Sequence, residues 1–198
     1  MDIQEAHLVL CGYRDSLGDL ILEKQSGGDM DAVYLRRQLA INRDRVASLA
    51  RGVPEDLARW KLDPETWSIL EVVSHLADEE EFDFPVRLRL ILKESEKEWP
   101  EIDPAGWVIE RKYNEGDLFE TLNRYVKLRN ESLEWLDSIE NPDWETKYEA
   151  PFGEISAGDM FVSWVTHDLL HLRQLVELQR FHLEEMAKPY RLDYAGDW

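Results

Sequence analysis

Two histidines near the C-terminus, His167 and His171, stand four residues apart. In a helix, their side chains would lie ~40° apart around the axis and ~6 Å apart along it, so both could bind one metal ion. The same face carries apolar residues, among them Trp164, Leu175 and Leu178, which predicts that both rings point inward. Buried polar rings need partners, and either a metal ion or hydrogen bonds within the core would supply them. No glutamate follows His167, so the metalloprotease motif H-E-x-x-H is excluded.

His75 is the predicted third ligand. It lies about two turns into a helix that Ser68 and Glu71 predict to begin with a capping box, and its neighbours are small or apolar. Three inward histidines on two helices would leave positions for water or substrate, as catalytic zinc sites do. Imidazole ligands suit several divalent metals. The other histidines, His7 and His182, have no partner at a useful spacing.

Two acidic residues, Asp78 and Glu79, follow His75 by about one helical turn. Either could be a fourth ligand, a partner that orients a ligand, or a general base, and Glu79 is the candidate catalytic residue. The alternative is that the acidic run over residues 78–81 is a solvated helix face. Asp168 points ~100° away from His167 and is predicted to be solvated or structural.

Helical periodicity dominates the chain. It predicts an all-α fold, a four-helix bundle with a long crossover connection, in one domain over residues 1–198. Residues 99–114 form that connection, and a short extended pair is expected within 142–155. The tail over 189–198 is expected to pack on the bundle. Helices are predicted at 3–24, 31–51, 68–98 with a kink at Pro85, 115–139 and 157–186.

Composition excludes several classes of function. The chain has 23 basic and 42 acidic residues, a net charge of −19, which disfavours binding to nucleic acid or to an anionic membrane. No apolar run approaches the ~20 residues that span a bilayer. The single cysteine, Cys11, cannot form an internal disulfide and is predicted to be a buried hydrophobe rather than a nucleophile. We expect a soluble, cytoplasmic protein, and the sequence does not decide whether it forms a homodimer.

Several segments together resemble the DinB-like, or YfiT-like, superfamily. The segment Trp67–Asp78 is similar to its "WS…E…HL.D" motif, and Phe161–Gln174 is similar to its "H…H…Q" terminal helix. The pairs Tyr113-Asn114 and Phe152-Gly153 and the closing residues Asp193–Trp198 resemble further landmarks. The resemblance covers about Asp31 to Trp198, and residues 1–30 stand outside it as an N-terminal extension.

The resemblance implies a four-helix bundle with a long second connection and a metal, zinc or nickel, held by His75, His167 and His171. Some members are transferases that act with low-molecular-weight thiols such as bacillithiol or mycothiol, including a maleylpyruvate isomerase branch. In that branch the second ligand is typically acidic, so the histidine at position 167 disfavours it. The family name implies no DNA chemistry.

Three functions follow as hypotheses. The first is a metal-dependent thiol S-transferase, in which the cation lowers the pKa of a cofactor thiol. The second is a metal-dependent hydrolase, and the third is a non-catalytic protein that binds metal or a small ligand. A thiol cofactor carries carboxylates, so the first requires Arg or Lys near His75, and the sequence does not place Arg87, Arg89 or Arg173 there. A hydrolase requires a base such as Glu79.

Overall fold

The computed structural model of the chain describes residues 30–93 and 96–196, and from Asp31 onward they form one compact unit. The predictions for residues 1–29, including the helix over 3–24, the interior position of Cys11 and the solitary His7, lie outside the described residues.

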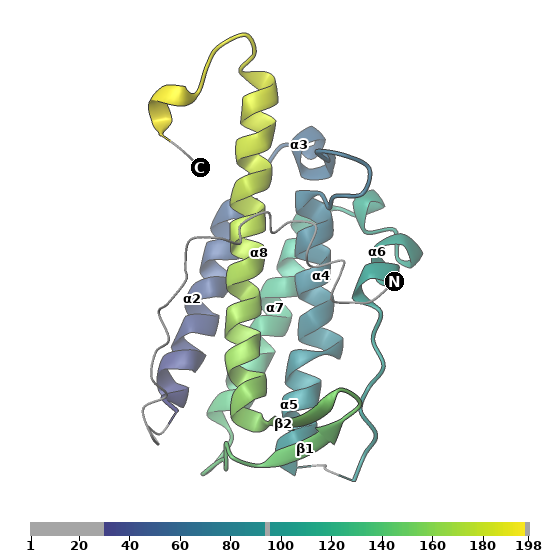
Figure 1. Ribbon diagram of the computed structural model, residues 1–198, viewed down its shortest axis with the longest axis vertical. Coiled ribbons are helices and arrows are strands. Elements are labelled where there is room, and N and C mark those ends of the chain that lie inside the picture. Colours follow the sequence, from purple (N-terminus) through teal and green to yellow (C-terminus); the bar gives the residue numbers. More distant parts are fainter. Residues whose placement is uncertain (1–29, 94–95, 197–198) are drawn as a thin grey trace. The chain divides into compact units, whose positions relative to one another are not determined.

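Four helices form a bundle, as the periodicity predicts (Figure 1). They are α2 (Ala32–Ala50), α4 (Ile69–Phe82), α7 (Leu118–Asp137) and α8 (Ala157–Met186). Helix α4 packs mainly on α7, α7 on α2, and α2 on α8, while α8 also contacts α4 and closes the ring. Apolar side chains of all four helices meet in the core between them. The two histidine-bearing helices, α4 and α8, are therefore held as neighbours.

The helix that begins at Ser68 differs from the prediction at its C-terminal end. The capping box is present, because Ser68 accepts from the Glu71 amide and the Glu71 side chain accepts from the Ser68 amide. The helix ends at Phe82, and a separate helix, α5 (Phe84–Lys93), follows a break at Asp83, whose φ and ψ are −118° and −98°. Pro85 then stands in the first turn of α5, where its missing N–H costs nothing. The predicted single kinked helix to residue 98 is wrong.

The connection between α5 and α7 contains structure of its own. It carries helix α6 (Pro104–Glu110) and the 3-10 turn η1 (Tyr113–Glu115), both of which contact α4. A further short helix, α3 (Glu55–Arg59), precedes α4. The predicted extended pair is confirmed as an antiparallel hairpin of β1 (Lys147–Ala150) and β2 (Gly153–Ser156), with Ala150 opposite Gly153. The long crossover therefore covers one side of α4 rather than forming an open loop.

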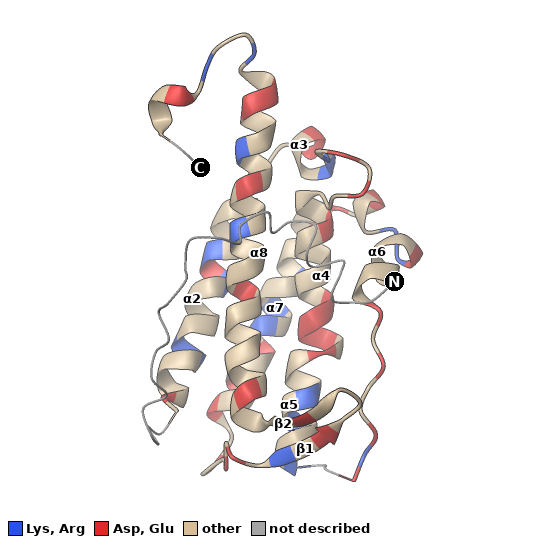
Figure 2. Cartoon of the chain, in the orientation of Figure 1, with Lys and Arg blue, Asp and Glu red and all other residues tan. Residues whose placement is uncertain are grey.

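Two expectations about exposed and buried residues are overturned. The tail beyond α8 does not pack on the bundle over its described part, since Tyr190 and Tyr194 are 82% and 104% exposed. Acidic positions follow one another along the C-terminal half of α4 (Figure 2), and residues 78–80 of that run are buried rather than solvated. None of the described helices combines the length and apolar character needed to cross a membrane.

A buried charged cluster ties the four helices together. Arg129 of α7 donates through both terminal nitrogens to Asp168 of α8, at 2.7 and 2.8 Å, and lies 2.7 Å from Glu80 of α4. It also donates to the Leu39 carbonyl of α2 at 3.1 Å. The side chains of Arg129, Glu80 and Asp168 are each only 1% exposed. Asp168 is therefore structural and not solvated, and the cluster fixes how α4 and α8 lie against each other.

Candidate metal centre

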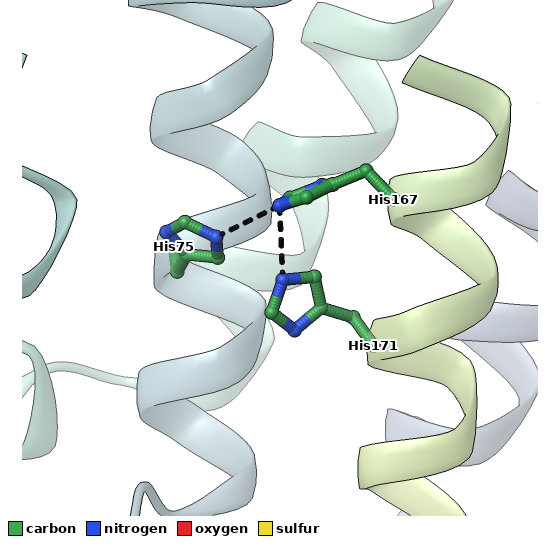
Figure 3. Close-up of side chains that lie close together, drawn as sticks. All are labelled: His75, His167 and His171. Carbon is green, nitrogen blue, oxygen red and sulfur yellow. Dashed lines mark hydrogen bonds between the residues drawn. The ribbon is translucent and has the colours of Figure 1, made fainter. Parts of the chain in front are cut away.

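Three imidazoles converge between α4 and α8, as Figure 3 shows. His75 comes from α4, and His167 and His171 come from successive turns of α8. The Nε2 atom of His167 lies 3.4 Å from Nε2 of His75 and 3.1 Å from Nε2 of His171. One nitrogen of each ring lies within 4.8 Å of the other two. The structure therefore brings together the three histidines that the sequence selected.

These spacings fit one divalent ion. Zinc–nitrogen bonds of ~2.0–2.1 Å at tetrahedral angles place ligand nitrogens about 3.3 Å apart. Ligands at right angles, as on an octahedral ion, would lie about 2.9 Å apart at the same bond length. The distances of 3.4 and 3.1 Å lie close to these two values. The donor set and its geometry suit zinc and nickel equally, and do not choose between them.

Each of two rings has a polar group near its far nitrogen. The Nδ1 atom of His171 lies 2.8 Å from the side-chain oxygen of Gln174, one turn further along α8. The amide oxygen can only accept, so it selects the tautomer with hydrogen on Nδ1 and leaves the Nε2 lone pair facing the other rings. The Nδ1 atom of His75 lies 3.6 Å from Oε1 of Glu79, while its Nε2 faces His167. The Gln174 contact matches the carbonyl partners of metal-bound histidines, whereas the Glu79 oxygen, at 3.6 Å, is beyond hydrogen-bond distance of His75.

Aromatic rings flank the cluster. The Trp67 ring centre is 4.9 Å from that of His75 and 6.3 Å from that of His171, to which it is nearly parallel. The Phe84 ring centre lies 5.0 Å from that of His167. Apolar walls lower the local dielectric and strengthen electrostatic interactions at the site. Sequence reasoning gave neither ring a role, because Trp67 precedes α4 and Phe84 follows the break at Asp83.

Comparisons with known proteins agree with this arrangement. The family model of the DinB superfamily matches residues 38–175. The chain belongs to the DinB superfamily. Among solved structures it is similar to YfiT from Bacillus subtilis, described as a probable metal-dependent hydrolase with an unusual four-helix bundle topology. That match has a TM-score of 0.70 and 17% identity over 80% of this chain and 91% of YfiT, so it shows a shared fold. A search of curated proteins found no match.

In this DinB-superfamily chain, the acidic run after His75 is mostly interior. Asp78, 1% exposed, accepts hydrogen bonds from Arg111, Tyr113 and Arg124. Glu80 lies against Arg129 and accepts from the Trp164 indole at 2.7 Å. The cations that hold Asp78 and Glu80 come from α6 to α7, far away in the sequence, which is why periodicity alone did not predict their burial.

Glu79 lies behind His75 in an unusual electrostatic setting. Burial, followed by the neighbouring Asp83 carboxyl, raises the pKa of Glu79 well above its ordinary value. Burial also raises the pKa of Asp83, although Arg87 stands 2.7 Å from it. A protonated Glu79 can share its proton with Asp83 and relieve the repulsion between the two carboxyls. Glu79 thus lies on the Nδ1 side of His75, whereas the Nε2 atom of that ring faces His167.

The arginines that the sequence could not place lie elsewhere. Arg87 binds Asp83 and donates to the Pro100 carbonyl at 3.1 Å. Arg89 lies over the Trp135 ring, and Arg173, half-exposed, pairs with Glu177 at 2.7 Å. Two other arginines, Arg111 and Arg124, bind Asp78, which follows His75 by about one turn of α4. His182 packs edge-on against Trp60, and among residues 30–93 and 96–196 it is not part of a group that could hold a metal ion.

Proposed function

We propose that the chain binds one divalent metal ion, zinc or nickel, through His75, His167 and His171. The observation that carries this proposal is the convergence of three imidazole nitrogens at the spacing that a single ion requires. The Gln174 amide supports it, because its oxygen holds the His171 ring with a lone pair turned inward. The alternative is that His167 and His171 are hydrogen-bonded core residues without a metal, but that arrangement would not require a third imidazole at the same point.

The bound ion would act as a Lewis acid that lowers the pKa of a thiol or of water. We infer that the reaction is the transfer of a low-molecular-weight thiol to an electrophilic carbon: the sulfur–carbon bond forms, the leaving group departs with its bonding electrons, and the thiol proton passes to solvent. The cluster contains no carboxylate among the described residues, and Glu79 is behind His75 rather than beside the converging nitrogens. A thiol at a metal ion loses its proton without a dedicated base, so this arrangement suits a thiol nucleophile. Trp67 and Phe84 would keep water away from the flanks of the site.

Metal-dependent hydrolysis is the second candidate. It is favoured by the likeness to YfiT, whose structure is described as that of a probable metal-dependent hydrolase. Attack by water whose pKa the ion lowers would be assisted by a proton acceptor close to the ion. The Glu79 carboxyl lies 3.6 Å from His75 Nδ1, and it would have to reach past the ring to serve as that acceptor. The orienting role therefore fits its position better.

The experiment combines metal analysis with two activity assays. Purified protein is stripped of metal, reloaded with zinc or nickel, and its metal content measured by elemental analysis. Conjugation of several low-molecular-weight thiols to a chromogenic electrophile, and thiol-free hydrolysis of a chromogenic ester, are then followed. We expect one ion per chain and metal-dependent conjugation.

A matched pair of variants controls this experiment. His171→Ala should lose both metal and activity, whereas His182→Ala should keep both, because the His182 ring packs against Trp60 and is not one of the three converging histidines. Ester hydrolysis without conjugation would replace the transferase by the hydrolase. Stoichiometric metal without either activity would leave a metal-binding protein, and no bound metal in the unchanged chain would refute the proposal.

A further inference from the structure

A polar cavity of about 480 Å³ lies beside α4, and its lining contains none of the three converging histidines. Its lining comes from α4, the α6–η1 turn and the start of α7, and we call it the arginine pocket. The lining residues are Ser74, Asp78, Glu81, Phe82, Arg111, Lys112, Tyr113, Gly116, Thr121 and Arg124. Three of them are basic and two acidic, a positive surplus in a chain of net charge −19. The volume is within the range of small-molecule sites.

The two arginines of the pocket are fixed in place by the protein. Asp78 accepts from Arg111 with one oxygen and from Arg124 with the other, the latter at 2.6 Å, and Tyr113 donates to it as well. The Arg111 guanidinium also lies 3.9 Å from the Trp107 ring centre and 4.8 Å from that of Phe82. A guanidinium that is already ordered loses little further freedom when a ligand binds.

Each arginine keeps N–H donors that the described part of the chain does not use. A guanidinium has five N–H donors. Among the described residues, Arg111 donates only through Nη1, to Asp78. Arg124 donates only through Nη2, to Asp78 and Glu81. Their side chains remain 34% and 39% exposed, and that of Lys112 is 67% exposed. The remaining N–H groups are therefore accessible to a molecule in the pocket.

The donor groups of the pocket keep their protons. Burial works to lower the pKa of Arg124, but the hydrogen bonds and charges of Glu81 and Asp78 raise it above its ordinary value. Burial and the hydrogen bond to Asp78 raise the pKa of Tyr113, so its hydroxyl keeps its proton and donates. Asp78 is thus satisfied by three donors. It anchors both arginines without being the group that a ligand must displace.

We propose that the arginine pocket binds a small molecule through an anionic group with two or more oxygens, a carboxylate or a phosphate, which Arg111 and Arg124 hold with Lys112 at the rim. Planar guanidinium forks match the oxygens of such groups and form charge-assisted hydrogen bonds with them. Ser74 and Asp78 lie ~100° and ~60° around α4 from His75, so the pocket adjoins the face that carries the histidine without including it. The proposal does not depend on a bound metal.

Calorimetric titration of metal-free protein at low ionic strength tests this proposal, with succinate and inorganic phosphate as separate probes. We expect saturable one-to-one binding of at least one probe, and the tighter probe identifies the anion as carboxylate or phosphate. Arg111→Gln and Arg124→Gln should each weaken binding about tenfold or more, because each removes a charged donor pair. Gln keeps an N–H that can donate to Asp78, and circular dichroism shows whether each variant folds.

Three further variants keep the test decisive. Lys112→Gln, at an exposed position where the ammonium pairs with the exposed Glu115, should weaken binding even if an arginine variant fails to fold. Arg37→Gln, on the exposed face of α2, changes the net charge equally and should leave binding unchanged. His171→Ala should also leave it unchanged. The proposal is overturned if neither probe binds, if Arg37→Gln weakens binding as much as the pocket variants, or if binding disappears with His171→Ala.

Discussion

Replacing Gln174 tests the metal centre through a residue that touches no metal. The Gln174 oxygen lies 2.8 Å from His171 Nδ1 and holds the ring in the orientation that turns Nε2 toward His167 and His75. Gln174→Leu keeps a side chain of similar size but removes the acceptor, so the ring loses both its fixed tautomer and its orientation. Loss of such a partner typically weakens metal binding 10- to 100-fold, which is about 1.4–2.7 kcal/mol.

The matched variant is Gln174→Glu. A carboxylate accepts the same hydrogen bond and makes the imidazole a more basic ligand, so zinc affinity should be equal to that of the unchanged protein or higher. The assay is competition with a chromophoric zinc chelator at pH 7.5, with urea unfolding of the metal-free proteins as the measure of stability. Gln174 is only partly buried, so we expect both variants to unfold within about 1 kcal/mol of the unchanged chain.

Two results would refute this reasoning. If Gln174→Leu binds zinc as tightly as the unchanged chain, the hydrogen bond to His171 does not prepare a ligand. If Gln174→Leu and Gln174→Glu lose affinity equally, the side chain acts through packing and not through its acceptor.

Three further predictions concern the ligands and the buried charges. His171→Ala should lose most zinc affinity while His182→Ala keeps it, as measured by the same competition, and equal affinity in both would remove His171 from the site. Metal content after dialysis should fall steeply between about pH 7 and pH 5, because imidazoles with an ordinary pKa near 6.5 must be neutral to bind; full retention at pH 5 would contradict a three-imidazole site. Arg129→Met should lower the free energy of unfolding by about 3–5 kcal/mol in urea, because it leaves Glu80 and Asp168 buried without their cation. Burial raises the pKa of Glu80, so as the pH rises the unfolded chain releases the Glu80 proton before the folded variant does. The loss in free energy of unfolding should therefore be larger at pH 8 than at pH 5. A pH-independent loss below 1 kcal/mol would show that the cluster does not stabilise the bundle.

The sequence by itself determined the features that depend on local spacing. The α8 helix was predicted over 157–186 and is found there, with Ser156 and Asp159 forming the capping box at its start. Helical geometry fixes residues four apart on one face, so His167 and His171 had to lie close together once α8 formed. The Gln174 partner could have been found by the same rule, since it follows His171 by three residues.

Only the tertiary structure decided which polar groups are interior and what they bind. The acidic run after His75 looks like a solvated face when α4 is considered alone, but Asp78 and Glu80 are buried because Arg124 and Arg129 of α7 meet them. Their partners are 46 and 49 positions away, and no local period encodes a contact over that separation. The break at Asp83 likewise replaced a kink expected at Pro85. Burial of a charge depends on a cation from another helix, and packing between helices, not spacing along one, places that cation.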